Sequence, residues 1–289
     1  MKKMIIPSNL DEIKSSMDYV DAYLIGINNM CISNGLNINI EDLNEIINIT
    51  KGKEIFININ KNMENKDIDN LRNILLELNN YSIKGIFYYD VAVLNIYNEC
   101  EFHYDLVWAS EHATTNYDTI NFWYSFGVSY TQLSSDITLN EVYDIRKNTD
   151  CKLIVPIFGY QQMFASKRHI VNNYLKQFNI VDNSKINYME KEDKIYPIID
   201  NNLGTGVYSN YILNGINEYF NLLDKDIDYL LFDSFNISDN DFIEVLKIVN
   251  NLSRDNIKDS YEHINSLFKN TDSGFLYKET IARVKKNEK

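Results

Sequence analysis

Cysteines, long apolar runs and positive charges are scarce in this chain of 289 residues. Its three cysteines, Cys31, Cys100 and Cys151, are spaced too widely for a disulfide framework or a metal-ligand motif. No run approaches the roughly eighteen consecutive apolar residues that a membrane-spanning helix needs. The apolar run near the N-terminus is short, which indicates a first strand rather than a signal peptide. We therefore expect a cytoplasmic protein with no membrane partner.

Basic residues are outnumbered, because 28 Lys and Arg stand against 41 Asp and Glu, and the formal net charge is −13. Nucleic-acid binding draws on clustered positive side chains that release counterions, so the overall field of this chain opposes it. Local basic surface remains at Lys167, Arg168 and His169 and in the C-terminal tail. The acidic excess by itself is typical of a soluble globular protein.

Several common catalytic motifs are also missing. No glycine-rich dinucleotide fingerprint follows the first strand-like run, and the chain contains no P-loop. It has no G-x-S-x-G elbow of a serine hydrolase. It also lacks the paired His or Cys spacings that are typical of zinc sites, so we expect no metal site.

Apolar, strand-like runs alternate with helical patterns from one end of the chain to the other. Such alternation is typical of an α/β fold with a parallel sheet, and eight units is the number that closes a TIM-type (β/α)8 barrel. A doubly wound open sheet is the main alternative, and the missing dinucleotide fingerprint disfavours it. The eight predicted strands cover residues 4–7, 22–27, 54–60, 85–90, 106–111, 129–135, 152–159 and 229–234.

One segment interrupts this alternation between the seventh and eighth units. Residues 183–210 contain two short strand-like pieces and a Gly-Thr-Gly turn, which predicts a small inserted β-hairpin. The seventh strand is expected to end at Gly159, with a helix beginning near Gln162, and residues 211–223 also have a helical pattern. We predict a barrel domain over residues 1–253, with residues 254–289 forming a C-terminal helix and tail packed on it.

Residues at the carboxyl ends of barrel strands line the functional site of this fold. His112 with Glu111 or Asp136 could perform acid–base chemistry there. Two of these residues also have structural alternatives: Ser135, Asp136 and Thr138 all fit an N-cap of the helix predicted from Leu139, and His112 fits a structural hydrogen bond. The other polar candidates at strand ends are Asn58, Asn60, Asp90, Ser110, Asn116, Ser134, Ser135, Tyr160, Gln161, Gln162 and Asp233.

The order of motifs resembles the collagenase-like peptidase family U32. The matching pieces include "GIFYYDVAVLNIY", "KLIVPIFGYQQMFASKRHI" and "YPIIDNNLGTGVYSN". The resemblance covers residues 80–240 well and implies a TIM-barrel-like catalytic domain. Gly159, Ser166 and Arg168 match the family signature. We expect Ser166, Arg168 and the neighbouring His169 to bind substrate, with a purely structural role as the alternative for the Arg168 guanidinium.

The signature also shows where this chain departs from the family. Ile154 stands at the position of the signature glutamate, and the two signature cysteines are replaced by Gln162 and His169. In members that hydroxylate tRNA uridine or ubiquinone precursors, those cysteines hold an iron–sulfur cluster, which normally needs four thiolates. We therefore expect no cluster and no other cofactor in this chain.

Three hypotheses follow from these observations. The first is a cluster-free subunit of the tRNA uridine hydroxylation branch that works with a homologous, cysteine-bearing U32 subunit. The second is a peptidase or other hydrolase of unrecognised mechanism, in which His112 acts with Asp136 or Glu111. The third is a non-catalytic barrel that binds a small polar ligand or a protein. The corresponding substrates would be tRNA or a peptide.

Overall fold

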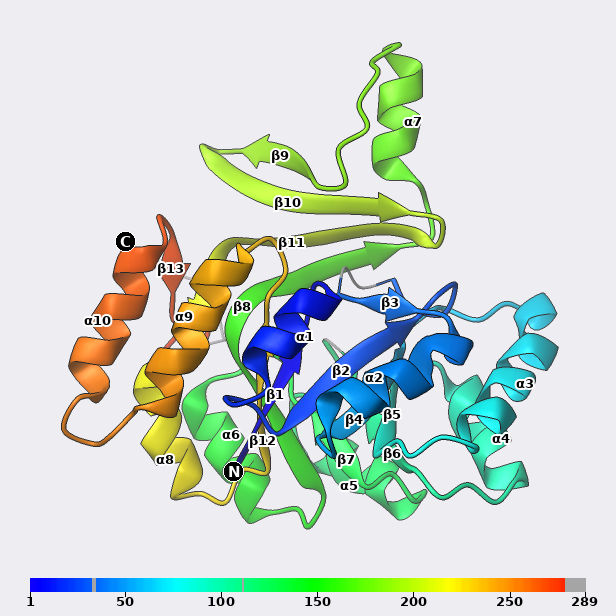
Figure 1. Cartoon of the computed structure of the whole chain (residues 1–289), viewed down its shortest axis with the longest axis horizontal. Helices are drawn as coiled ribbons and strands as arrows, with labels where there is room; N and C mark the ends of the chain where they lie inside the picture. Colours follow the sequence, from blue (N-terminus) through cyan, green and yellow to red (C-terminus); the bar gives the residue numbers. More distant parts are fainter. Residues whose placement is uncertain (33–34, 111, 279–289) are drawn as a thin grey trace, which may run out of the picture.

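The computed structural model describes residues 1–32, 35–110 and 112–278, in which eight parallel strands form a closed barrel surrounded by helices (Figure 1). The ring closes because β12 pairs with both β8 and β1. This architecture confirms the predicted TIM-type (β/α)8 barrel. The strands of the ring are β1 (Lys2–Ile6), β2 (Ala22–Ile27), β4 (Glu54–Ile59), β5 (Gly85–Tyr88), β6 (Asp105–Trp108), β7 (Tyr130–Gln132), β8 (Lys152–Ser166) and β12 (Tyr229–Asp233).

The helices pack on the outside of the ring through one apolar face each. In α3, for example, Leu71, Leu75 and Leu78 recur at helical spacing and are fully buried. None of the described helices is both long and apolar enough to cross a membrane. The outer helices are α1 (Leu10–Ser16), α2 (Leu43–Thr50), α3 (Ile68–Leu78), α4 (Val91–Glu99), α5 (Tyr117–Ser125), α6 (Leu139–Lys147), α8 (Tyr219–Leu223), α9 (Asp239–Asn250) and α10 (Ile257–Leu267).

Each barrel strand is buried on both faces. In β2, Leu24 belongs to the cluster that fills the barrel, whereas Tyr23 and Ile25 belong to the layer between strands and helices. Inside the barrel, Phe56 makes edge-on ring contacts with Tyr130 and Tyr229 at centroid distances of 5.8 and 5.7 Å. Burial on both faces explains why these strands are continuous apolar runs in the sequence.

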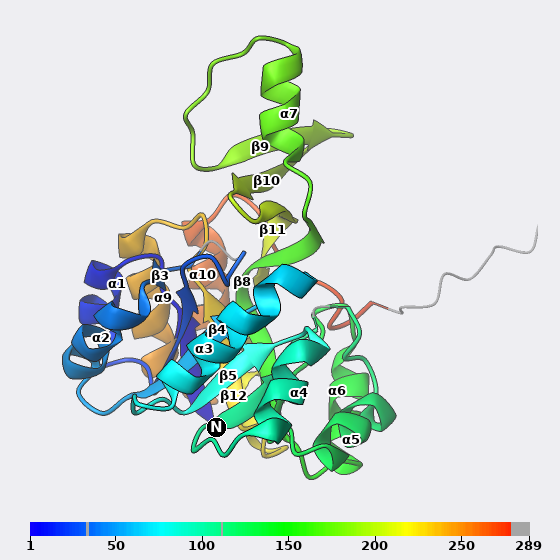
Figure 2. The same cartoon turned by 90° about the vertical axis from the view of Figure 1, so that its right-hand side faces the viewer.

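Residues 160–210 form an arm that projects from the carboxyl end of the barrel (Figures 1 and 2). Strand β8 continues past Gly159 into the arm and pairs antiparallel with β11 (Gly204–Asn214). Strands β10 (Lys194–Asn201) and β9 (Asn187–Lys191) extend this antiparallel sheet. Helix α7 (Ile170–Gln177) stands on the arm and has no buried residue. Two short strands, β3 (Asn37–Ile38) and β13 (Thr271–Asp272), pair with β2 and β11.

The arm corrects two predictions and confirms a third. The seventh strand does not end at Gly159, and no helix begins near Gln162, because residues 160–166 pair with β11 and the helix begins only at Ile170. Residues 211–214 are strand rather than helix. The inserted hairpin is confirmed as β10–β11. Long-range strand pairing has overridden the local pattern in both corrected segments.

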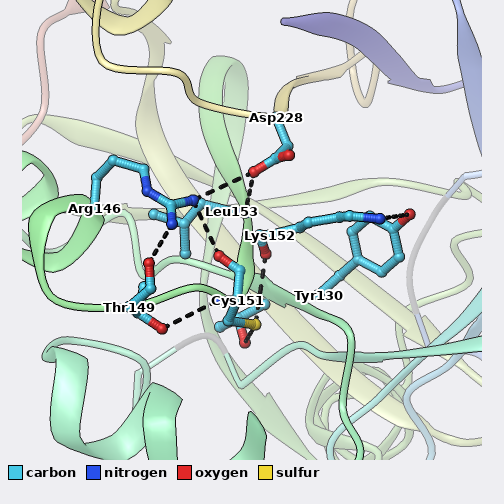
Figure 3. Close-up of polar contacts among 8 residues, drawn as sticks. Tyr130, Arg146, Thr149, Cys151, Lys152, Leu153 and Asp228 are labelled. Carbon is cyan, nitrogen blue, oxygen red and sulfur yellow. Dashed lines mark hydrogen bonds and ion pairs between the residues drawn. The ribbon is translucent and has the colours of Figure 1, made fainter.

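A polar network fixes β8 at the opposite, amino-terminal end of the barrel (Figure 3). The guanidinium of Arg146 donates to the carbonyl oxygens of Cys151 and Thr149 and lies 3.5 Å from the carboxylate of Asp228. Asp228 also accepts a hydrogen bond of 2.9 Å from the backbone N–H of Leu153. Arg146 therefore connects α6 to the loop before β8 and to the start of β12.

Replacing Arg146 with alanine should lower the free energy of unfolding by about 2 kcal/mol, because charge-assisted hydrogen bonds to two carbonyl groups are lost. Only 20% of the Arg146 side chain is exposed, so water replaces these bonds poorly. Chemical denaturation measures the effect. The control is Arg254→Ala, which breaks an exposed ion pair with Asp224 and should cost less than about 1 kcal/mol. Equal losses in the two variants would show that the network adds nothing.

Candidate functional site

A cavity of about 90 Å³ lies at the carboxyl end of the barrel, where the arm leaves it. Apolar side chains line it together with five residues that carry side-chain amides. Its described lining contains no Lys, Arg or His, which favours a neutral polar ligand over an anion. The lining residues are Ile6, Leu24, Asn58, Asn60, Phe87, Ala109, Gln132, Leu133, Ser135, Pro156, Phe158, Tyr160, Gln161, Gln162, Tyr208, Leu231 and Asp233.

A second pocket of about 340 Å³ adjoins this cavity on the side of β6. The two share Asn60, Ala109 and Gln162, so we treat them together as the mouth groove. His112 and Ser110 belong to the second pocket. The structure therefore brings nine of the predicted site residues to one groove: Asn58, Asn60, Ser110, His112, Ser135, Tyr160, Gln161, Gln162 and Asp233.

Asp233 is the carboxyl group of the cavity. It ends β12, and its Oδ1 accepts a hydrogen bond of 2.9 Å from the backbone N–H of Phe235. Burial raises the pKa of Asp233 to about 7 against the weaker opposing effect of that hydrogen bond. Near neutral pH this carboxyl group can therefore either donate or accept a proton, as acid–base chemistry requires.

The base of the arm holds the amide side of the groove in place. Gln161 donates its backbone N–H to Ser209 Oγ at 3.0 Å and its side-chain amide to the carbonyl of Gly159 at 2.9 Å. Phe235 packs against Tyr208, with a ring-centroid distance of 4.0 Å. These contacts tie β8 and β11 to the loop after β12, so the arm and barrel form the groove together.

The two residues predicted to act as an acid–base pair contact each other, and His112 lines the second pocket. His112 Nδ1 lies 3.2 Å from Asp136 Oδ2, and 55% and 47% of the two side chains are exposed. Asp136 does not cap α6, because Thr138 holds that position and forms a capping box with Glu141. Glu111, the third predicted catalytic residue, lies outside the described residues.

Replacing His112 with alanine should change the free energy of unfolding by less than about 1 kcal/mol, because exposed ion pairs contribute little. Thermal unfolding at pH 6 and pH 8 would measure this directly. The matched variant Asp136→Asn should behave in the same way. A loss well above that bound would show that the pair is part of the structural framework rather than a free functional group.

Other predicted site residues accept hydrogen bonds from backbone N–H groups. Asp90 is the N-cap of α4, where its two oxygens accept hydrogen bonds from the N–H groups of Ala92 and Met63 at 3.0 and 2.8 Å. Asn116 caps α5 through a bond of 2.8 Å from Thr119 N–H. Ser134 Oγ accepts from the N–H of Asp136 at 3.1 Å. These side chains shape the loops around the groove.

The remaining predicted residues lie where β8 meets α7, farther out along the arm. His169 Nδ1 lies 2.9 Å from Oδ1 of Asp200, whose side chain is only 4% exposed. Ser166 Oγ accepts the backbone N–H of Arg168 at 3.1 Å. The two positions that carry cysteine in the family signature are thus separated here, with Gln162 in the mouth groove and His169 at the start of α7.

Sequence reasoning missed one buried ionisable group near the groove. Glu12 of α1 is 1% exposed, and its Oε2 accepts hydrogen bonds from Ser8 N–H and Ser234 Oγ at 2.8 and 3.0 Å. Its Oε1 has no hydrogen-bond partner among the described residues. Burial raises the pKa of Glu12 to about 7. Nothing in the local pattern "NLDEIK" distinguishes this glutamate from an exposed helical one.

A closed parallel barrel with polar side chains at its carboxyl-end mouth defines a TIM-barrel protein. Within that class, the chain belongs to peptidase family U32, whose sequence model matches residues 8–284. The chain is 26% identical over 265 residues to the tRNA hydroxylation protein P2 of Bacillus subtilis (strain 168), and the alignment covers 83% of this chain and 85% of that protein.

Solved structures match this chain at much lower identity. A dihydrodipicolinate synthase matches with a TM-score of 0.50 and 7% identity over 92% of this chain and 82% of its own. A chain of the tryptophan synthase complex from Pyrococcus furiosus matches with a TM-score of 0.45 and 10% identity, covering 92% and 98% of the two chains. These matches concern the barrel fold alone.

Proposed function

We propose that this chain is a cluster-free subunit of a tRNA uridine hydroxylation system and works with a cysteine-bearing chain of the same family. The observation that carries the proposal is the match to tRNA hydroxylation protein P2, combined with Gln162 and His169 at the signature cysteine positions. A tRNA substrate would place the protein in the cytoplasm.

The cluster-free part of the proposal rests on the available donors. Cys31 lies after β2, Cys100 is the C-cap residue of α4, and Cys151 precedes β8 at the opposite end of the barrel. Gln162 offers an amide, and the imidazole of His169 is engaged with Asp200. This donor set does not fit an iron–sulfur cluster, which needs several thiolates converging on one site. The partner would therefore supply the cluster and the redox chemistry.

The mouth groove would contribute substrate binding in this proposal. Its amides, including Asn58 and Gln132, can donate and accept hydrogen bonds as the edge of a flipped nucleobase requires. Asp233 adds a group that can hold a proton at neutral pH. The chain's net charge of −13 works against its binding tRNA unaided, which favours a partner that supplies positive surface.

Co-expression in a host without its own uridine hydroxylation tests the proposal. The chain, a cysteine-bearing homologue and the pair are each expressed, and tRNA hydroxyuridine is measured by nucleoside mass spectrometry. We expect hydroxyuridine only with the pair, and iron and sulfide only in preparations that contain the homologue. Stoichiometric iron in the isolated chain, or full hydroxylation by the homologue alone, would overturn the proposal.

Variants of residues in the mouth groove test whether the substrate binds there. Asp233→Asn and Gln162→Ala in the pair should lower the hydroxyuridine yield at least tenfold while the pair still co-purifies. Glu45→Gln, an exposed change on α2, is the control and should leave the yield unchanged. Unchanged yields in both groove variants would show that the substrate is not held in this groove.

Hydrolysis is the second candidate, and the His112–Asp136 pair beside the pocket is the observation that favours it. The pair resembles the base and its orienting carboxylate in hydrolases, with Ser110 lining the same pocket. Cleavage of gelatin or of a peptide library by the wild-type chain, lost in His112→Ala, would favour this candidate. No cleavage under varied metals would rule against it.

A further inference from the structure

Exposed apolar side chains are concentrated on the arm. Of the eighteen large apolar residues that are well exposed in the described chain, ten lie within residues 160–210, less than a fifth of the sequence. Apolar surface of this extent, rich in aromatic residues and methionine, is typical of protein interfaces. The ten residues are Met163, Phe164, Ile170, Tyr174, Phe178, Ile180, Val181, Tyr188, Met189 and Ile195.

Strand β9 is the outer edge of the arm sheet. The strands follow the order β8-β11-β10-β9, and within the described residues β9 pairs only with β10. It is the strand of the arm sheet farthest from the barrel in Figure 1. Four of its five residues, Tyr188 to Lys191, are exposed. Such an edge presents backbone N–H and C=O groups that another strand can pair with.

We propose that β9 pairs antiparallel with β9 of a second copy of this chain, across a two-fold axis at Met189. In that register Met189 faces its own copy, Tyr188 faces Glu190, and Asn187 faces Lys191. No two like charges stand opposite each other, as a stable antiparallel pair requires. The contact is isologous, so it closes as a dimer with one continuous sheet across the two arms.

The formal charges of the arm and of the barrel favour a second copy of this chain, rather than nucleic acid, as the partner of β9. The arm contains six Lys and Arg and five Asp and Glu, so its own formal charge is only +1. The rest of the chain carries the remaining excess of fourteen negative charges. Contact through the arms keeps the two acidic barrels apart, whereas a nearly neutral surface gives RNA phosphates little attraction. This inference does not rest on the proposed function.

The mass of the full-length chain in solution tests the proposal, measured by light scattering and sedimentation velocity over a range of concentrations. We expect a dimer for the wild-type chain. Met189→Lys sets two ammonium groups opposite each other and should raise the dissociation constant at least tenfold. Its melting temperature should equal that of the wild-type chain at concentrations where both are monomeric. Met189→Glu should do the same, and a mixture of the two variants should restore the dimer. A wild-type chain that is monomeric throughout overturns the proposal.

Two controls locate the contact. Leu76→Lys adds the same charge at an exposed position on α3 and should leave the dimer intact. Met189→Cys should form an intermolecular disulfide on oxidation, because residues that face each other across antiparallel strands are close enough to be bridged. A dimer that survives Met189→Lys, or arm variants that change only tRNA retention, would show that β9 is not the dimer interface.

Discussion

Replacing Glu12 with glutamine should raise the free energy of unfolding at pH 8 by about 3 kcal/mol and leave it nearly unchanged at pH 4. The folded chain keeps this carboxyl buried, and burial raises its pKa from the ordinary value of 4.5 to about 7. Above pH 7 the wild-type protein therefore holds a buried carboxylate whose Oε1 has no partner among the described residues. Glutamine removes that charge and keeps the shape of the side chain.

The direction of this change of stability with pH follows from proton binding. Between pH 4.5 and pH 7 the folded state keeps the proton on Glu12 while the unfolded state loses it, so stability falls as pH rises. The whole fall is on the order of 3 kcal/mol and levels off above pH 7. Asp233, whose pKa is also raised to about 7, adds a second fall of the same sign, so the variant should keep part of the slope.

Urea denaturation at several pH values from 4 to 8 measures this effect. Glu45→Gln, at an exposed position on α2, is the control and should reproduce the wild-type pH profile. If Glu12→Gln lowered the stability at pH 8, the carboxylate would be stabilising through its bonds to Ser8 and Ser234 rather than through its neutral form.

The eight barrel strands could be predicted because central parallel strands are buried on both faces and become continuous apolar runs. The six residues of β2, "AYLIGI", are all buried, for example. Helices were recognisable from single apolar faces such as that of α3. The number of units then determined the architecture without any knowledge of the long-range contacts.

The arm was less predictable because its strands are stabilised by pairing rather than by pattern. Residues 160–166 mix amides, aromatics and small side chains, and only their register with β11 makes them a strand. The spacing of Ile212, Ile216 and Tyr219 imitates a helix, yet the chain there passes from β11 through a 3₁₀ turn into the short α8. Local periodicity carries no information about such partners.

The residues of the candidate site likewise differ in how well the sequence predicts them. Gln162 and Asp233 could be placed at the mouth because they stand at or just beyond predicted strand ends. Asp90 and Asn116 met the same criterion, but their side chains cap helices, a role that strand position alone does not distinguish. Glu12 could not be found, because its burial depends on Ser234, which lies 222 residues away in the chain.

Replacing Gly159 with alanine should cost about 3–5 kcal/mol or prevent folding. Gly159 has a φ of +115°, and a Cβ atom there would lie 2.4 Å from the carbonyl oxygen of Asp233. The register between β12 and β8 shifts just before this point, between Leu231 and Phe232. An added methyl group must therefore push β12 away and displace the carboxyl group that lines the cavity.

Gly127→Ala separates the two causes of the stability loss in Gly159→Ala, which are backbone strain and the steric contact with Asp233. Gly127 has a φ of +90°, but no atom lies within 4 Å of the position its Cβ would take, so only the backbone strain of about 1–2 kcal/mol applies. Chemical denaturation of both variants gives the difference, which measures the contact with Asp233. Under the proposed function, hydroxyuridine formation by Gly159→Ala with the co-expressed homologue should also fall, since the mouth groove changes shape. Equal losses of stability in the two variants would show that Asp233 moves aside at little energetic cost. Gly159 would then be needed only for its backbone conformation.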